Sequence, residues 1–265
     1  MPVALEMGWR HLLFESWPVE PETLEAHLPN GLVADVHDDR AWLSVTPFTN
    51  VDLRPRGFPR WLGIDLPEIN VRTYVRRESD RRGDGRRGDD PTSSGAHGEP
   101  GVYFFSLDAA SVASVFGARL THHLPYFYAR ASLRTTGDGV RFASRRRHPG
   151  ARAASYAATY RAIGEPFAAS EDPLASFLTE RYRLYTEAAD GTLRHTDVEH
   201  EPWTLYPASA TVTTNTMLEA SGLPAPDAEP IRYYSPGVDV VARPSERVKP
   251  RSERIGAATV RRAPE

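Results

Sequence analysis

The chain contains no cysteine, and only one of its 32 lysine and arginine residues is a lysine, Lys249. Without cysteine it can hold no disulfide, no thiolate zinc site and no cysteine nucleophile. The scarcity of lysine matters as much, because a lysine amine is the usual nucleophile of Schiff-base chemistry. Arginine cannot take that role, since its guanidinium stays protonated.

Long apolar runs are also absent, and no stretch approaches the length of a membrane span. The opening segment MPVALEMGWRHLLFESW lacks the basic region and apolar core of a secretory signal. We therefore expect a cytoplasmic protein with no membrane partner. The formal net charge of −3 gives no reason to expect a nucleic-acid partner either. The sequence leaves open whether the protein forms a homo-oligomer.

What is present predicts many short strands and few helices. Strands are expected at 8–17, 32–36, 41–48, 68–75, 101–108, 126–136, 140–147, 151–162, 192–203, 203–214 and 231–242. The segments 32–36 and 41–48 are expected to form a hairpin, as are 68–75 and 101–108. Helices are expected at 21–28, from a cap at Asp108 to about Arg119, at 173–188, and at 216–221.

Because strands mostly follow strands, the order predicts a largely antiparallel sheet. The expected fold class is α+β, mainly β: a closed or cone-shaped antiparallel β-barrel with a few short flanking helices. Residues 1–243 are expected to form a single domain. Its polar segment 76–100 cannot bury enough surface to fold and predicts a disordered hairpin loop. Residues 244–265 are expected to be a disordered basic tail.

None of the familiar sequence motifs for catalysis, nucleotide binding or metal binding identifies a function. GDGRRG at 83–88 matches a dinucleotide fingerprint but lies in the charged segment, with no helix after it. His122 and His123 point to opposite faces of an extended chain, as do His195 and His200, so neither pair chelates one ion. The sequence has no G-x-S-x-G elbow and no P-loop. We expect no cofactor and no metal site.

The segment EINVRTYV, residues 68–75, carries the most informative pattern. Its alternation places Glu68, Asn70, Arg72 and Tyr74 on one face. Alternation alone favours a solvent-facing polar side, the commonest arrangement in antiparallel sheets. Glu68 and Arg72 are roughly 13 Å apart along a strand. They cannot pair directly, but they could hold separate ends of one ligand.

Seven segments, taken in order, resemble the YqjF-like family of uncharacterised bacterial and archaeal proteins. They are LPEINVRTYV, GVYFFSLDA, LPYFYAR, SRR, FLTERYRLY, HEPW and YYSPGVDVVA. The resemblance runs from about Gly8 to Ala242, and only the long 76–100 loop and the basic tail depart from it. The family is similar at fold level to acetoacetate decarboxylase, whose cone-shaped barrel surrounds a small-molecule cavity. The resemblance therefore implies that the polar face of 68–75 points inward.

The decarboxylase chemistry is not expected to follow. The resemblance would place the Schiff-base lysine pair near 117–126, and this segment has no lysine. Three hypotheses remain. In the first, a small-molecule-binding barrel holds a carboxylate or carbonyl compound. Arg72 binds the anion, helped by Arg130 or Arg146, while Asn70 and Tyr74 orient a carbonyl or hydroxyl.

In the second hypothesis the chain is an enzyme of lyase, hydratase or isomerase type. Glu68 is then the general acid or base, and Tyr74 or His200 assists. In the third, the polar residues of 68–75 form a buried structural network with no ligand. The sequence does not choose among them, and it names no ligand.

Overall fold

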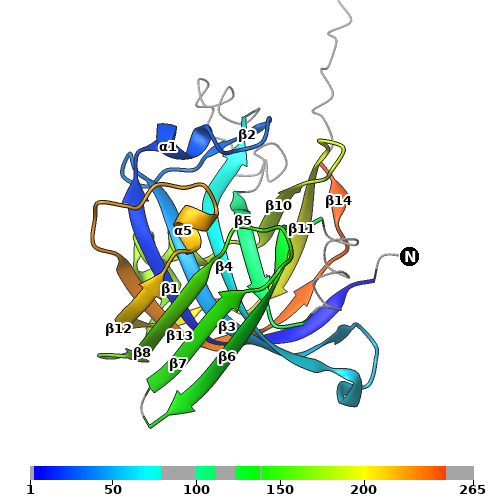
Figure 1. Ribbon diagram of the computed structural model, residues 1–265, viewed down its shortest axis with the longest axis vertical. Coiled ribbons are helices and arrows are strands. Elements are labelled where there is room, and N and C mark those ends of the chain that lie inside the picture. Colours follow the sequence, from blue (N-terminus) through cyan, green and yellow to red (C-terminus); the bar gives the residue numbers. More distant parts are fainter. Residues whose placement is uncertain (1–2, 79–99, 112–122, 138, 249–265) are drawn as a thin grey trace, which may run out of the picture.

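The computed structural model describes residues 3–78, 100–111, 123–137 and 139–248 (Figure 1). The strands are β1 (Leu5–Val19), β2 (Leu32–Ala34), β3 (Ala41–Pro55), β4 (Ile64–Arg77), β5 (Gly101–Ala109), β6 (Tyr126–Thr136), β7 (Gly139–Arg146), β8 (Ser155–Ala162), β9 (Phe167–Ala168), β10 (Arg183–Glu187), β11 (Leu193–His200), β12 (Thr204–Asn215), β13 (Ile231–Ala242) and β14 (Glu246–Arg247). The α-helices are α1 (Pro21–Glu25), α4 (Pro173–Thr179) and α5 (Met217–Ala220), with 3-10 turns at Arg60–Leu62 and Ala169–Glu171. None of the helices in the described part of the chain has the length and apolarity needed to cross a bilayer.

The strands pair into two closed rings that share one wall. The shared wall is β13–β1–β3–β4–β5. One ring of nine strands closes through β6, β7, β8 and β12. A second ring of seven strands closes through β10 and β11. In Figure 1, β6, β7 and β8 lie on one side of the molecule and β10, β11 and β14 on the other.

The mainly-β barrel fold is therefore confirmed, although the barrel is mixed rather than purely antiparallel. β5 runs parallel to both β6 and β10, while the other pairings that close the two rings are antiparallel. A shared wall has an energetic consequence: the middle parts of β3 and β4 are buried on both faces, as in sheets covered on two sides. On β4, for example, Ile69 and Val71 face one ring, and Glu68 and Asn70 face the other, yet all four are buried.

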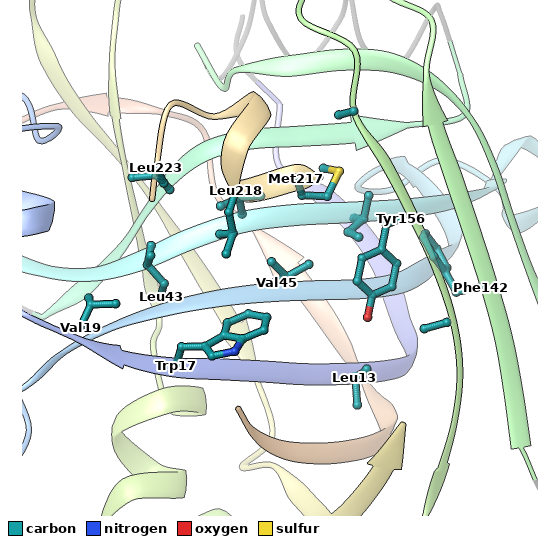
Figure 2. Packing of buried hydrophobic residues seen from close by; sticks show 14 of the residues in the cluster. Leu13, Trp17, Val19, Leu43, Val45, Phe142, Tyr156, Met217, Leu218 and Leu223 are labelled. Carbon is teal, nitrogen blue, oxygen red and sulfur yellow. The ribbon is translucent and has the colours of Figure 1, made fainter. Parts of the chain in front are cut away.

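The nine-stranded ring is filled by side chains. Figure 2 shows Leu13 and Trp17 of β1, Leu43 and Val45 of β3, and Tyr156 of β8 converging beneath α5. Met217 and Leu218 of α5 close this core from above. Asn215 supports the start of that helix, because its Oδ1 accepts a hydrogen bond from the Met217 amide at 3.1 Å. We call this region the packed ring.

Bulges decide which residues of the shared wall face the other ring. On β1, the inward residues are odd-numbered up to Trp9 and even-numbered from Leu12. The parity changes at a register shift where His11 adopts a positive φ of 56°. β3 changes parity in the same way near Asp52, where φ is also 56°. Such one-residue insertions are a common device for re-aiming side chains in barrels.

Several local expectations were wrong. The predicted helix 173–188 ends at Thr179, and its second half forms β10, which pairs with β5 and β11. Asp108 does not cap a helix but lies buried in β5. β2 pairs with β4 rather than β3, so 32–48 is not a hairpin. The secondary-structure propensities of the residues and the periodicity of the apolar positions could not show these strand pairings, because tertiary packing decides them.

The expected boundaries of the irregular segments also shift. β4 continues to Arg77, and β5 pairs antiparallel with it, as predicted for this hairpin. The expected loop at 76–100 otherwise falls on residues 79–99, which lie outside the described residues. The tail, expected to be disordered from 244, begins with β14, which pairs with Arg194 and His195 of β11. The rest of the tail and the predicted helix after Ser111 also lie outside the described residues.

Candidate functional site

The seven-stranded ring encloses a cavity of about 510 Å³. All seven of its strands contribute side chains, and α4 and the segment before β12 cover one end. Cavities of this size usually hold a small organic ligand and combine apolar walls with a few polar groups. We call this region the cavity ring, in contrast to the packed ring behind the shared wall.

The cavity has an exposed end and a buried end. At the exposed end, Leu53 and Pro55 of β3 lie beside Ile64 of β4, and 43% of Ile64 is exposed. Inward residues then follow along β4 in the order Leu66, Glu68, Asn70 and Arg72. Around Arg72 the walls are deeply buried, with Phe14 1%, Val102 1% and Phe104 6% exposed. Arg72 therefore lies at the floor of the cavity.

Glu68 lies half-way down the wall and is almost completely buried. Its Oε2 accepts hydrogen bonds from Asn50 Nδ2 and from the Tyr126 hydroxyl, both at 3.0 Å. Burial raises the pKa of this carboxyl to about 7, and the charge of Asp108 adds to the effect, although the two hydrogen bonds oppose it. Among the described residues no cation pairs with Glu68 and none donates to its Oε1.

Three arginines line the cavity, and they differ in their partners. Arg54 is paired with Glu6 at 2.8 Å and with Asp52 at 2.5 Å. Arg181 donates to Asp35 at 2.7 Å. In the described chain Arg72 has no carboxylate partner: its Nη2 donates to the carbonyl oxygen of Leu178 at 3.1 Å, and its Nε has no partner. Such an unmatched guanidinium in a cavity suits an anionic ligand.

Other polar atoms around the floor also lack partners within the described residues. They are the Asn70 Oδ1, the Thr46 Oγ1 and the indole Nε1 of Trp203. All three residues line the cavity. Buried polar atoms are nearly always hydrogen-bonded to protein, water or ligand, because leaving them unpaired is costly. Together with Arg72 Nε they provide two donors, one acceptor and one hydroxyl that can do either.

His200 adds a neutral base to the wall. Its Nδ1 lies 2.8 Å from the carbonyl oxygen of Glu201, and because a carbonyl only accepts, Nδ1 carries the proton. Burial lowers the pKa of His200, so the imidazole is neutral with a bare Nε2. The ring packs between Tyr182 at 4.6 Å and Trp203 at 5.0 Å, measured between ring centroids.

The sequence of this chain matches a known protein family. The family model of DUF2071, described as an uncharacterized conserved protein, matches residues 6–88 and 92–239. YqjF of Bacillus subtilis strain 168, described as an uncharacterized protein, is 38% identical over 241 residues, covering 91% of this chain and 90% of that protein. The chain belongs to the DUF2071 family. The resemblance to YqjF inferred from the sequence is confirmed.

Solved structures with a similar fold are distant in sequence. Acetoacetate decarboxylase from Legionella pneumophila has a TM-score of 0.59 at 15% identity, covering 94% of this chain and 88% of that one. The enduracididine biosynthesis enzyme MppR complexed with pyruvate has a TM-score of 0.62 at 12% identity, covering 94% and 91%. At this identity the likeness establishes the fold of this DUF2071 protein and not its activity.

The structure brings four of the seven residues singled out from the sequence into one cavity: Glu68, Asn70, Arg72 and His200. The polar face of β4 thus points inward, and the solvent-facing alternative does not hold. The reason is that β4 is shared by two rings and has no solvent-facing side.

The other three singled-out residues do not line the cavity. Tyr74 is fully buried behind it, with its hydroxyl 2.7 Å from Ser44 Oγ. Arg146 is buried in a two-point ion pair with Asp108, with Nη2 to Oδ1 at 2.6 Å. Arg130 is exposed on β6, in the wall of the packed ring. These three residues therefore do not join Glu68, Asn70, Arg72 and His200 in this cavity, and their predicted role in ligand binding or catalysis stays a prediction.

Sequence reasoning missed Asn50, Tyr126, Thr46 and Trp203. A signal existed for two of them, because Thr46, Phe48 and Asn50 alternate along β3 just as Glu68 and Asn70 do along β4. No comparable signal marked Tyr126 or Trp203, since each reaches the cavity from the end of a strand or the segment beside it.

Proposed function

We propose that this DUF2071 protein binds a small-molecule carboxylate in the cavity ring, with Arg72 holding the carboxylate. The observation that carries the proposal is the contrast among the cavity arginines. Arg54 and Arg181 are neutralised by carboxylates of the protein, whereas Arg72 is not. The Arg72 side chain is half-buried, with its Nε fully buried, so its charge carries a desolvation cost that an anionic ligand would offset.

The surrounding atoms fit the rest of such a ligand. Asn70 and Trp203 line the cavity, and a rotation of their side chains would let the unpartnered Oδ1 accept a hydroxyl or amide proton and the unpartnered Nε1 donate to a carbonyl oxygen. That a structural neighbour, MppR, forms a complex with pyruvate supports the idea that this barrel accommodates a small keto acid. We expect the ligand to bind without a lysine adduct, since the segment 117–126, where the resemblance would place the lysine pair, contains no lysine.

The test is isothermal titration calorimetry with a panel of keto, hydroxy and aromatic acids. Arg72→Met is compared with Arg130→Met, which removes an exposed arginine outside the cavity. We expect Arg72→Met to weaken binding by at least tenfold, the range of a hydrogen bond to a charged group, and Arg130→Met to leave it unchanged. Binding that is equal in wild type and Arg72→Met would refute the proposal.

A second candidate function rests on Glu68. A buried carboxyl with a pKa raised to about 7 is poised to give and take protons near neutral pH. Asn50 and Tyr126 hold its Oε2, which leaves Oε1 for the proton. We propose as this second function that Glu68 transfers a proton to or from a bound carbonyl compound, in a lyase, hydratase or isomerase reaction.

Glu68→Gln tests this function separately from binding. The amide keeps the size of the side chain and its ability to accept from Asn50 and Tyr126, but it cannot transfer a proton. We expect unchanged calorimetric binding and a loss of turnover of about 100-fold or more. Equal turnover in wild type and Glu68→Gln would remove Glu68 from the mechanism and leave a binding protein.

A further inference from the structure

The cavity ring distributes its polar and apolar residues unevenly along its length. Arg72, Asn70 and Thr46 cluster toward the buried floor. At the exposed end the facing residues of β1, β3 and β4 are apolar: Leu5, Leu53, Pro55, Ile64 and Leu66. The one charged residue among them, Arg54, is already paired with Glu6 and Asp52. A ligand that reaches the exposed end therefore meets hydrocarbon there.

The walls differ across the cavity as well. The hydrogen-bonded group of Asn50, Glu68 and Tyr126 occupies the wall made by β3, β4 and the start of β6. Opposite this group, β11 and β13 present Val198 and Ala242 beside the polar Thr196 and His200. β1 lies next to β3, with Trp9 paired to Asn50, and presents apolar side chains along its whole length. From the floor to the exposed end, the lining residues of β1 are all apolar: Phe14, Leu12, Trp9, Met7 and Leu5.

The cavity is also long. Arg72 and Ile64 are eight positions apart on β4, roughly 26 Å along the strand, so a two- or three-carbon acid held by Arg72 would leave most of the apolar wall uncovered. Burying apolar surface is the main source of binding free energy in such a pocket. The exposed Ile64 and Leu62 continue the apolar surface beyond the cavity.

We infer that the ligand is an amphipathic monocarboxylate, with its carboxylate on Arg72 and an extended hydrocarbon body along β1 toward Ile64. This inference rests on the proposed carboxylate site and names the class of molecule that fills it. It distinguishes this cavity from one built for a short keto acid, in which polar groups would surround the ligand on all sides.

The test is calorimetry with butanoate, hexanoate, decanoate and hexadecanoate, and with the alcohols of the same lengths. Each added methylene is expected to tighten binding about fourfold, the effect of burying one CH₂ group. Replacing the carboxylate by the alcohol should weaken binding at least tenfold. Arg72→Met should erase the difference between acid and alcohol but preserve the dependence on chain length.

A matched pair of variants places the hydrocarbon body. Ile64→Ser removes an apolar side chain at the exposed end of the cavity, and Ile163→Ser removes one of equal exposure, 42%, away from it. Ile64→Ser should weaken hexadecanoate binding by about twofold or more and leave butanoate unchanged, since only the longest chain extends far enough from Arg72 to reach Ile64. Ile163→Ser should change neither ligand.

The outcomes separate the two proposals. If acids bind through Arg72 with no gain from added methylenes, the amphipathic ligand is refuted and the carboxylate site stands. If acids and alcohols bind equally and Arg72→Met has no effect, the carboxylate site is refuted. If hexadecanoate responds equally to Ile64→Ser and Ile163→Ser, the hydrocarbon body does not lie toward Ile64, and the inference fails.

Discussion

The packed ring and the cavity ring share β13, β1, β3, β4 and β5, so the same five strands face two different interiors. On the packed side, α5 packs against Phe142 of β7, Tyr156 of β8 and the aliphatic side chains of β1 and β3 in one hydrophobic core (Figure 2). On the cavity side about 510 Å³ stays open, and unpartnered polar atoms border it. The difference teaches that one wall of strands can carry a hydrophobic core on one face and border an open cavity on the other.

The charged groups of the two rings differ in the same way. Arg146 and Asp108 lie on the packed side of the shared wall and satisfy one another, and Arg146 also covers the ring of Phe127 at 4.0 Å. On the cavity side, Glu68 and Arg72 have no charged partners among the described residues. The charges of Arg146 and Asp108 thus neutralise one another, whereas neither Glu68 nor Arg72 forms an ion pair with another described residue.

The largest expected effect comes from the two arginines. Arg146→Met leaves Asp108 buried without its partner and should cost about 3–5 kcal/mol of the free energy of unfolding. Arg72→Met removes an unmatched charge, so stability should stay the same or rise. Urea denaturation measures both. Equal losses in the two variants would mean that Arg72 is structural, which would support the buried-network hypothesis.

A second comparison uses neighbours on β1. Leu13 faces the packed ring and Leu12 the cavity, and both are almost fully buried. Leu13→Ala should cost about 2–5 kcal/mol, because the surrounding side chains close a new void only in part. Leu12→Ala should cost less, since the vacated space joins an existing cavity. Denaturation curves showing Leu12→Ala to be the more destabilising variant would contradict an open cavity.

The third effect is a pH dependence from Glu68. Its folded pKa of about 7 lies above the ordinary 4.5, so between these values the folded state holds a proton that the unfolded state has released. Stability therefore falls as pH rises through this window, by up to about 3 kcal/mol, and levels off above pH 7. Glu68→Gln should lose less stability than wild type between pH 5 and pH 8. Parallel stability curves would show that Glu68 titrates normally.

Much of the fold was predictable because strand period and turn residues are local signals. The strands around EINVRTYV, GVYFFSLD and SYAATYRA follow from alternation, and Asn215 marked the start of α5. The division of 173–188 into α4 and β10 was not predictable. Leu184 and Tyr185 have helical spacing with Phe177 and Leu178, and only the pairing with β5 and β11 draws them into a strand.

The candidate site was predictable to the extent that one strand carries it. Alternation grouped Glu68, Asn70 and Arg72, but it also included Tyr74, which lies just behind the cavity. Alternation could not show that Arg146 forms an ion pair with Asp108, because the two residues lie on β7 and β5 and are 38 positions apart in the sequence. The bulges at His11 and Asp52 could not be predicted from the sequence either, and they decide which side chains of β1 and β3 point into the cavity.

The most direct test of the central claim is a crystal structure of the protein with decanoate bound. The account predicts two carboxylate oxygens on the guanidinium of Arg72, with the chain running past Trp9 toward Ile64. It would be contradicted by a cavity filled with protein side chains, or by a carboxylate bound elsewhere while Arg72 pairs with an acidic residue of its own chain.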